Sequence, residues 1–247
     1  MPFSWNKKFS IFAAAFLVII FIGFLIGIFN LDDEKKESVE KIPSETSPES
    51  FTFFDLDANT VFNDDIREEL RDQLGSDAVE YWSPVDLKIH HGGFLQRYFP
   101  GLNELDQRLN PEKGLRFEHN TIKLTYRYAR KKELPFDFVM LIFSNYTKKP
   151  LFFKISAKKE AAYIVDALKK KYGEPGVFRW DDGKATTFHW EKNSDVLITS
   201  VVEDRFGKPE YHIMIYYVNN IQKLLSREQK EKEARMKERR KAGETAF

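Results

Sequence analysis

The strongest constraint on this chain is an uninterrupted apolar stretch near its N-terminus, residues 11–29. It reads IFAAAFLVIIFIGFLIGIF and contains no charged or strongly polar side chain. A helix of about 20 such residues, rising about 1.5 Å per residue, matches a hydrocarbon core of about 30 Å. The sequence therefore predicts a single transmembrane helix over residues 11–30, preceded by a short cytoplasmic N-terminus at residues 1–10.

A cleaved signal peptide is the main alternative for this stretch. Such peptides have an apolar core of about 7–15 residues, followed by a cleavage site of small residues. Here the apolar run is longer, and it ends in Gly27-Ile28-Phe29-Asn30-Leu31, which contains no pair of small residues at the required spacing. We therefore favour an uncleaved signal anchor.

The lysines around the span indicate its orientation. Lys7 and Lys8 precede it directly, whereas Lys35, Lys36 and Lys41 follow at a greater distance and are interleaved with acids. The positive-inside rule counts Lys and Arg on each side of a span. We therefore expect a single-pass protein of a bacterial inner membrane, with the remainder of the chain extracytoplasmic.

Two glycines in the span, Gly23 and Gly27, have the G-x-x-x-G spacing. This spacing places two positions without side chains on one helix face, where a second helix can approach closely in lipid. A homodimer through the anchor is one interpretation. The other is that these glycines face the bilayer, since glycine is common in membrane helices.

Residues 31–50 are predicted to form a disordered linker. The segment from residue 32 to 50 contains seven acids and three lysines, is rich in Ser and Pro, and has few apolar residues to bury. It would tether the following domain to the membrane.

Residues 51–225 are long enough to fold into a domain with a substantial core. Helices are expected over residues 65–74, 94–99 and 102–109, and the clearest helical pattern is an apolar stripe over residues 161–172. Alternating or continuous apolar runs predict strands at residues 85–90, 122–128, 136–143, 151–155, 177–180, 186–190, 196–202 and 211–217. Because short turns join the three strands before the helix at residues 161–172 and the four strands after it, the predicted fold class is α+β, with a curved antiparallel β-sheet packed against helices.

No motif for catalysis, a cofactor or a metal stands out. The chain has no cysteine, and its five histidines show neither H-x-x-x-H nor H-E-x-x-H spacing. We therefore assign no catalytic residue, cofactor or metal ligand. A formal net charge of +1 gives no electrostatic reason to expect a nucleic-acid partner.

Aromatic residues in the strand-like segments allow two interpretations. They could form a platform for a glycan or peptide, but aromatic residues at strand positions more often belong to the core. The residues concerned are Trp82, Trp180, Trp190, Tyr211, Tyr216 and Tyr217.

Residues 226–247 form a charged tail, expected to be a solvated helix or disordered. It contains eight Lys or Arg and five Glu. The candidates for binding an acidic partner or anionic headgroups are Arg235, Arg239, Arg240 and Lys241. A solvated helix of mixed charge is the simpler interpretation.

Together these features predict a non-enzymatic, membrane-anchored extracytoplasmic domain of the periplasmic type, which binds or scaffolds an envelope protein partner. Two other classes stay open. One is an envelope enzyme that acts on a cell-wall polymer, and the other is a carrier of an apolar ligand. Carboxylates clustered in a cleft would favour the enzyme, and a large dry cavity would favour the carrier.

Overall fold

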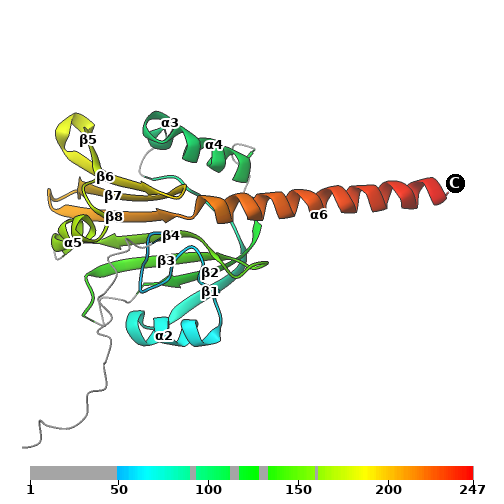
Figure 1. Cartoon of the computed structure of the whole chain (residues 1–247), viewed down its shortest axis with the longest axis horizontal. Helices are drawn as coiled ribbons and strands as arrows, with labels where there is room; N and C mark the ends of the chain where they lie inside the picture. The colour runs from blue at the N-terminus through cyan, green and yellow to red at the C-terminus, as the bar shows by residue number, and fades with distance from the viewer. Residues whose placement is uncertain (1–48, 90–92, 112–116, 128–132, 159–160, 247) are drawn as a thin grey trace, which may run out of the picture. The chain divides into compact units, whose positions relative to one another are not determined.

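The computed structural model describes residues 49–89, 93–111, 117–127, 133–158 and 161–246, and the predicted anchor with Gly23 and Gly27 lies outside them. The described residues form an α+β domain (Figure 1). Its helices are α2 (Asp64–Leu74), α3 (Phe94–Tyr98), α4 (Pro100–Leu109), α5 (Tyr163–Tyr172) and α6 (Val218–Thr245), with a short 3-10 turn at Asp181–Gly183. Its strands are β1 (Asp77–Ser83), β2 (His119–Tyr126), β3 (Phe136–Ser144), β4 (Pro150–Ala157), β5 (Gly176–Trp180), β6 (Ala185–Lys192), β7 (Asp195–Glu203) and β8 (Pro209–Tyr216).

The eight strands form one antiparallel sheet in the order β1-β2-β3-β4-β8-β7-β6-β5. Two meanders of four strands meet where β4 pairs with β8, and α5 carries the chain from one meander to the other. The predicted antiparallel sheet and the predicted fold class α+β are confirmed.

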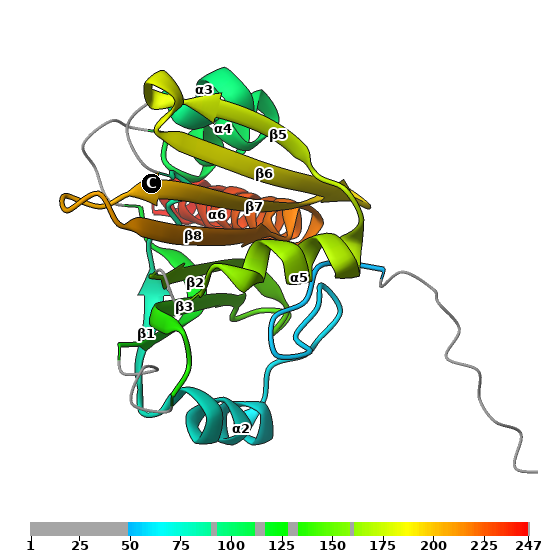
Figure 2. The ribbon, with the colours of Figure 1, turned by 90° about the vertical axis from the view of Figure 1, so that its left-hand side faces the viewer.

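Both faces of the sheet are covered, so successive residues of the central strands enter different cores. In β8, Ile213 and Ile215 pack with α2, α5 and the segment from Phe51 to Phe62, whereas Met214 and Tyr216 pack with α3, α4 and the start of α6. The period of two in a β-strand produces this division. Figure 2 shows α5 and α6 on different sides of the sheet.

The predicted helices form where apolar residues recur along one face. Leu102, Leu105 and Leu109 of α4 are all buried, as their spacing predicts. In α5, Val165 is buried and Ile164 is partly buried against the sheet. Gly173 follows α5 with φ 85° and so ends the helix in a conformation that favours glycine.

The predicted strand at residues 85–90 is wrong. Val85, Leu87 and Ile89 are buried and alternate with exposed residues, but residues 84–89 pair with no strand, and residue 90 lies outside the described residues. Side chains bind the backbone groups that a neighbouring strand would bind: the Leu87 N–H donates to Asp106 Oδ1 at 3.1 Å, and Tyr216 Oη donates to Leu87 O at 3.0 Å. Alternating burial therefore does not require a sheet partner.

Strand β1 was not predicted because its sequence has no clean alternation. It lies at one edge of the sheet and pairs only with β2, so several of its side chains stay exposed. Trp82 is 49% exposed and has φ 60°, where the register of β1 against β2 shifts. The bulge turns the end of this edge strand out of regular pairing.

Among the described residues, no helix combines the length and the apolar character that crossing a membrane requires. The longest of them is α6, which has 28 residues and leaves the sheet after β8 (Figure 1).

Candidate functional site

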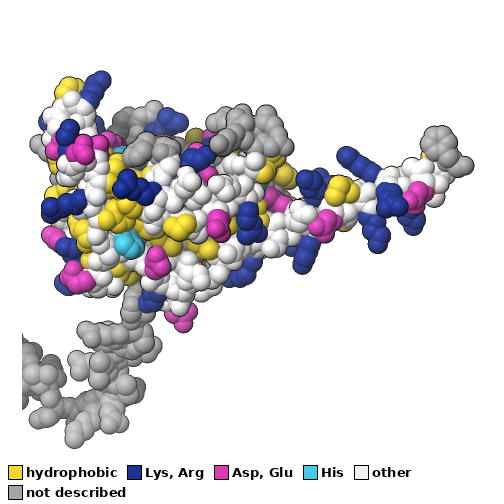
Figure 3. Space-filling view, turned by 90° about the horizontal axis from the view of Figure 1, so that it is seen from above, with side chains coloured by type: hydrophobic (Ala, Val, Ile, Leu, Met, Phe, Trp, Pro, Cys, Tyr) yellow, Lys and Arg dark blue, Asp and Glu magenta, His cyan; other side chains and the backbone are white. Residues whose placement is uncertain are grey.

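Helix α6 has two parts with different surroundings. Asn220, Ile221 and Leu224 are buried against the domain, whereas every described residue from Lys232 on is exposed. The first part is held at the sheet, and the second part projects from it (Figures 1 and 3). We call residues 232–245 the projecting part of α6.

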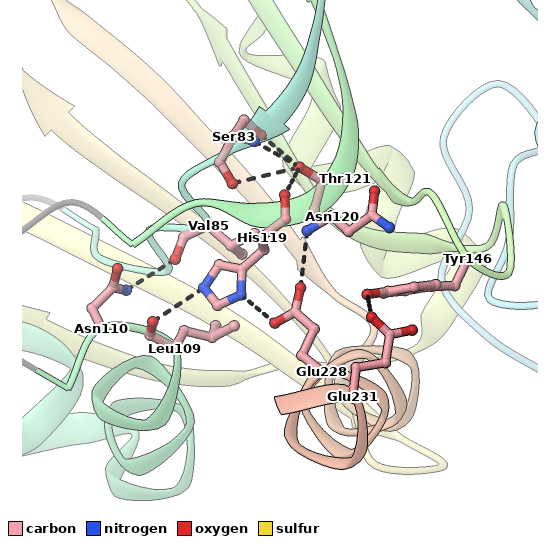
Figure 4. Close-up of polar contacts among 10 residues, drawn as sticks. All are labelled: Ser83, Val85, Leu109, Asn110, His119, Asn120, Thr121, Tyr146, Glu228 and Glu231. Carbon is pink, nitrogen blue, oxygen red and sulfur yellow. Dashed lines mark hydrogen bonds and ion pairs between the residues drawn. The ribbon is translucent and has the colours of Figure 1, made fainter. Parts of the chain in front are cut away.

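A buried histidine joins α6 to the sheet and to α4 (Figure 4). His119, at the start of β2, is 5% exposed. Its Nδ1 lies 2.7 Å from Glu228 Oε2, and its Nε2 lies 3.1 Å from the carbonyl oxygen of Leu109, the last residue of α4. Both ring nitrogens of His119 therefore face oxygen atoms, one on α6 and one at the end of α4.

The same glutamate holds the backbone of β2. The Asn120 N–H donates to Glu228 Oε1 at 2.9 Å, so both carboxylate oxygens of Glu228 are engaged. The Leu109 carbonyl is one of the groups that an α-helix leaves without an internal partner at its C-terminal end. His119 therefore binds the end of α4 and the base of α6 at once.

One turn further along α6, a second contact holds the helix. Tyr146 Oη donates to Glu231 Oε2 at 2.7 Å, and the Arg227 guanidinium lies 4.7 Å from the centre of the Tyr146 ring. Arg227 Nε also lies 3.5 Å from Glu231 Oε1. Burial, followed by the hydrogen bond to Glu231, raises the pKa of the Tyr146 hydroxyl above its ordinary value. Glu228 and Glu231 lie beyond residue 225, where the sequence places the end of the domain.

The N-terminal end of α6 is held by a buried aspartate. Asp195, the first residue of β7, accepts a hydrogen bond from Ser50 Oγ at 2.8 Å and another from the backbone of Val218, the first residue of α6. A carboxylate at this end of a helix interacts favourably with the helix dipole. Burial is the main cause that raises the pKa of Asp195 to about 6, and the two hydrogen bonds oppose it.

The four predicted binding residues of the tail lie on different sides of α6. With about 100° per residue, Arg235 and Arg239 continue the side that carries Leu224 and Glu228. Arg240 points elsewhere and pairs with Glu244 at 2.9 Å, and Lys241 lies on a further side. The structure therefore does not gather these four residues into one patch.

Two adjoining surface grooves run beside the base of α6. One, of about 500 Å³, lies between α4, the β6–β7 turn and the first turns of α6. The other, of about 750 Å³, follows α6 itself from Asn219 to Ala234. Gln222 lines both grooves, and the second one includes the cations Lys223, Arg227 and Lys230.

Neither a group of metal ligands nor an exposed aromatic platform forms among the described residues. Within the described ranges, no three His, Cys, Asp or Glu side chains come together in a group that could hold a metal ion. Of the six aromatic residues that could form a platform, Trp190, Tyr211, Tyr216 and Tyr217 are buried in the core, and only Trp82 is largely exposed.

The contacts at the base of α6 were not predicted from the sequence. His119 and Glu228 are 109 residues apart, and no local pattern links them. The lysines beside the second groove could have been found from the sequence, because Lys223, Lys230 and Lys237 recur every seven residues.

In comparisons with known proteins, no family model, curated protein or solved structure matched this chain.

Proposed function

We propose that this protein is a non-enzymatic binding or scaffolding module of the bacterial envelope, anchored by one membrane span and folded on the extracytoplasmic side. The apolar residues 11–29 and the lysines around them support the anchor and its orientation. In this proposal the domain presents α6 to an envelope protein partner, and the anchor keeps it near the membrane.

The observation that carries this proposal is the construction of α6. Its base is fixed by Glu228 and Glu231, yet every side chain described in its projecting part is exposed. A solvent-exposed helix of this length gains little stability from tertiary packing. A domain that fixes such a helix at its base is suited to present the helix to another molecule.

The two other classes receive less support from the described residues. The grooves beside α6 are open at the surface and have charged walls, which suits neither a dry cavity for an apolar ligand nor a cleft of clustered carboxylates. We therefore rank binding or scaffolding above the carrier and the enzyme.

Site-specific photo-crosslinking in the full membrane-anchored chain tests the proposal. A photoreactive residue would replace Ala234, which is exposed on the projecting part of α6, or Phe206, which is 69% exposed between β7 and β8. We expect Ala234 to give one discrete protein adduct in intact cells and Phe206 to give none. Equal adducts at both positions, or none at Ala234, would argue against α6 as the binding element.

A topology reporter tests the location separately. When it is fused after Phe247, it should be active only outside the cytoplasm. Cytoplasmic activity of this reporter would contradict the proposed location.

A further inference from the structure

A line of lysines follows one face of α6. Lys223, Lys230 and Lys237 are each seven residues apart, and Lys241 follows one turn later. Seven residues make almost two helical turns, or about 10.5 Å, so these side chains lie nearly in line over about 27 Å. We call these four residues the lysine face.

The lysine face is not neutralised by the acids of the described chain. None of its four lysines forms an ion pair within the described residues, whereas the neighbouring Arg227 and Arg240 pair with Glu231 and Glu244. Glu244 lies seven residues after Lys237 and so continues this line, but it pairs with Arg240, and Glu233 accepts a hydrogen bond from Gln229. A row of exposed cations therefore remains available to anions from outside.

The groove of about 750 Å³ lies along the half of the lysine face that is nearest the domain. Lys223, Arg227 and Lys230 line it together with the small or uncharged residues Asn219, Ser226 and Ala234. Glu231 is the single acid among the residues of this groove, and it is already bound to Tyr146 and Arg227. All eight residues that line this groove belong to α6, so it is an open hollow on one helix, and a segment that lies along α6 can place its acids against these cations.

The pattern favours a protein segment over a lipid surface. A helix that binds in the plane of a membrane needs a broad apolar face opposite its cations. The projecting part of α6 has one exposed large apolar residue, Met236, and it lies well away from the lysine face. A row of lysines seven residues apart, in contrast, complements carboxylates at the same spacing on a second helix. In coiled coils such charges flank an apolar seam, so on α6, which has no such seam in its projecting part, the attraction would be mainly electrostatic.

We infer that the lysine face binds an acidic helical segment of a protein partner, with carboxylates repeated about every seven residues. This inference rests on the proposed function, because it names the class of partner for the same helix. Charge complementarity would provide orientation and a fast association rate, and binding would weaken as salt screens the charges.

A designed peptide can test this without knowledge of the natural partner. The probe is a 24-residue helical peptide with glutamates every seven residues, and the control peptide has the same composition with those glutamates spread around the helix. Both are titrated into the full chain in neutral detergent at low and raised salt. We expect the probe to bind at least tenfold more tightly than the control peptide, and raised salt to weaken its binding.

Two triple variants of the chain give a matched comparison. Lys223→Gln, Lys230→Gln and Lys237→Gln remove the lysine face, whereas Lys232→Gln, Arg235→Gln and Arg239→Gln remove the same charge from another side of α6. All six residues are exposed, so both variants should keep their helical circular dichroism. The first variant should lose about tenfold in probe affinity, and the second less than threefold.

Three results would overturn the inference: equal binding of the two peptides, equal losses in the two variants, or binding to phosphatidylglycerol vesicles without binding to the probe peptide. The photo-adduct at Ala234, which lines the same groove as Lys223 and Lys230, separates this inference from the proposed function. If the adduct persists in the Lys223, Lys230 and Lys237 variant, the inference fails and the proposed function stands. If the unaltered chain gives no adduct, the proposed function itself fails.

Discussion

Ser50 Oγ donates a hydrogen bond of 2.8 Å to Oδ2 of Asp195, a residue 145 positions later in the chain, and both side chains are buried. Asp195 also accepts a hydrogen bond from the backbone of Val218. Asn219 Nδ2 reinforces this junction by donating to Asn193 O at 3.2 Å. The beginning of the described domain and the beginning of α6 are therefore fixed to the same turn between β6 and β7.

The Asp195 carboxylate should make the stability of the domain depend on pH. Burial raises its pKa from 3.8 to about 6, so the folded state binds more protons than the unfolded state between these values. The free energy of unfolding should therefore fall as pH rises through this window, by up to about 3 kcal/mol from this group. Above about pH 6 this loss is complete.

Asp195→Asn removes the titration and keeps an oxygen that accepts a hydrogen bond. In denaturant unfolding of the full chain in neutral detergent, the variant should gain stability relative to the original chain between pH 4 and pH 7. If the two stability profiles run parallel over this range, Asp195 does not titrate as proposed.

Glu228→Ala should destabilise the domain although residue 228 lies beyond the predicted domain end. The substitution leaves His119 Nδ1 and the Asn120 N–H without their acceptor, at a cost of about 2–3 kcal/mol. Gln229→Ala, at the neighbouring exposed position, should change the free energy of unfolding by less than about 0.5 kcal/mol. Denaturant unfolding measures both, and equal effects would contradict the described role of Glu228.

The hydroxyl of Tyr216 should stabilise the segment that replaces the expected strand at residues 85–90. Tyr216→Phe leaves the Leu87 carbonyl without this donor in a buried site and should cost about 1–3 kcal/mol. Tyr81→Phe, at a tyrosine that is largely exposed, serves as the control and should be nearly neutral. Unfolding curves that coincide for the two variants would show that the Tyr216 hydroxyl adds nothing.

Another prediction concerns self-association through the predicted membrane anchor. If Gly23 and Gly27 allow two spans to pack closely, Gly23→Leu with Gly27→Leu should weaken self-association of the full chain in a membrane assay. Ala14→Leu with Ala15→Leu is the matched control. Unchanged association in the glycine variant would mean that the span is a passive anchor.

Local periodicity allowed much of the fold to be predicted from the sequence. The apolar stripe at residues 161–172 and the alternation at residues 122–128 each lie near an element that the structure contains. Turns of a few residues then favour antiparallel neighbours, and this led to the correct fold class.

The errors and the omissions have a common physical origin. The spacing of residues within a segment does not show which distant residues the segment contacts in the folded chain. Residues 85–89 alternate like a strand, but Asp106 and Tyr216 bind their backbone from elsewhere in the chain. Strand β1 pairs with no strand other than β2 and does not need an alternating pattern. The base of α6 depends on His119 and Glu228, whose contact only the folded chain creates.

The account depends most directly on the claim that the domain holds α6 in one fixed direction. Since the chain has no cysteine, Met236→Cys and Tyr81→Cys would place two spin labels, one on α6 and one on β1. Pulsed electron paramagnetic resonance on the full chain should give one narrow distance distribution. It should broaden when Glu228→Ala removes the contact with His119. A broad distribution in the chain that keeps Glu228 would contradict the claim.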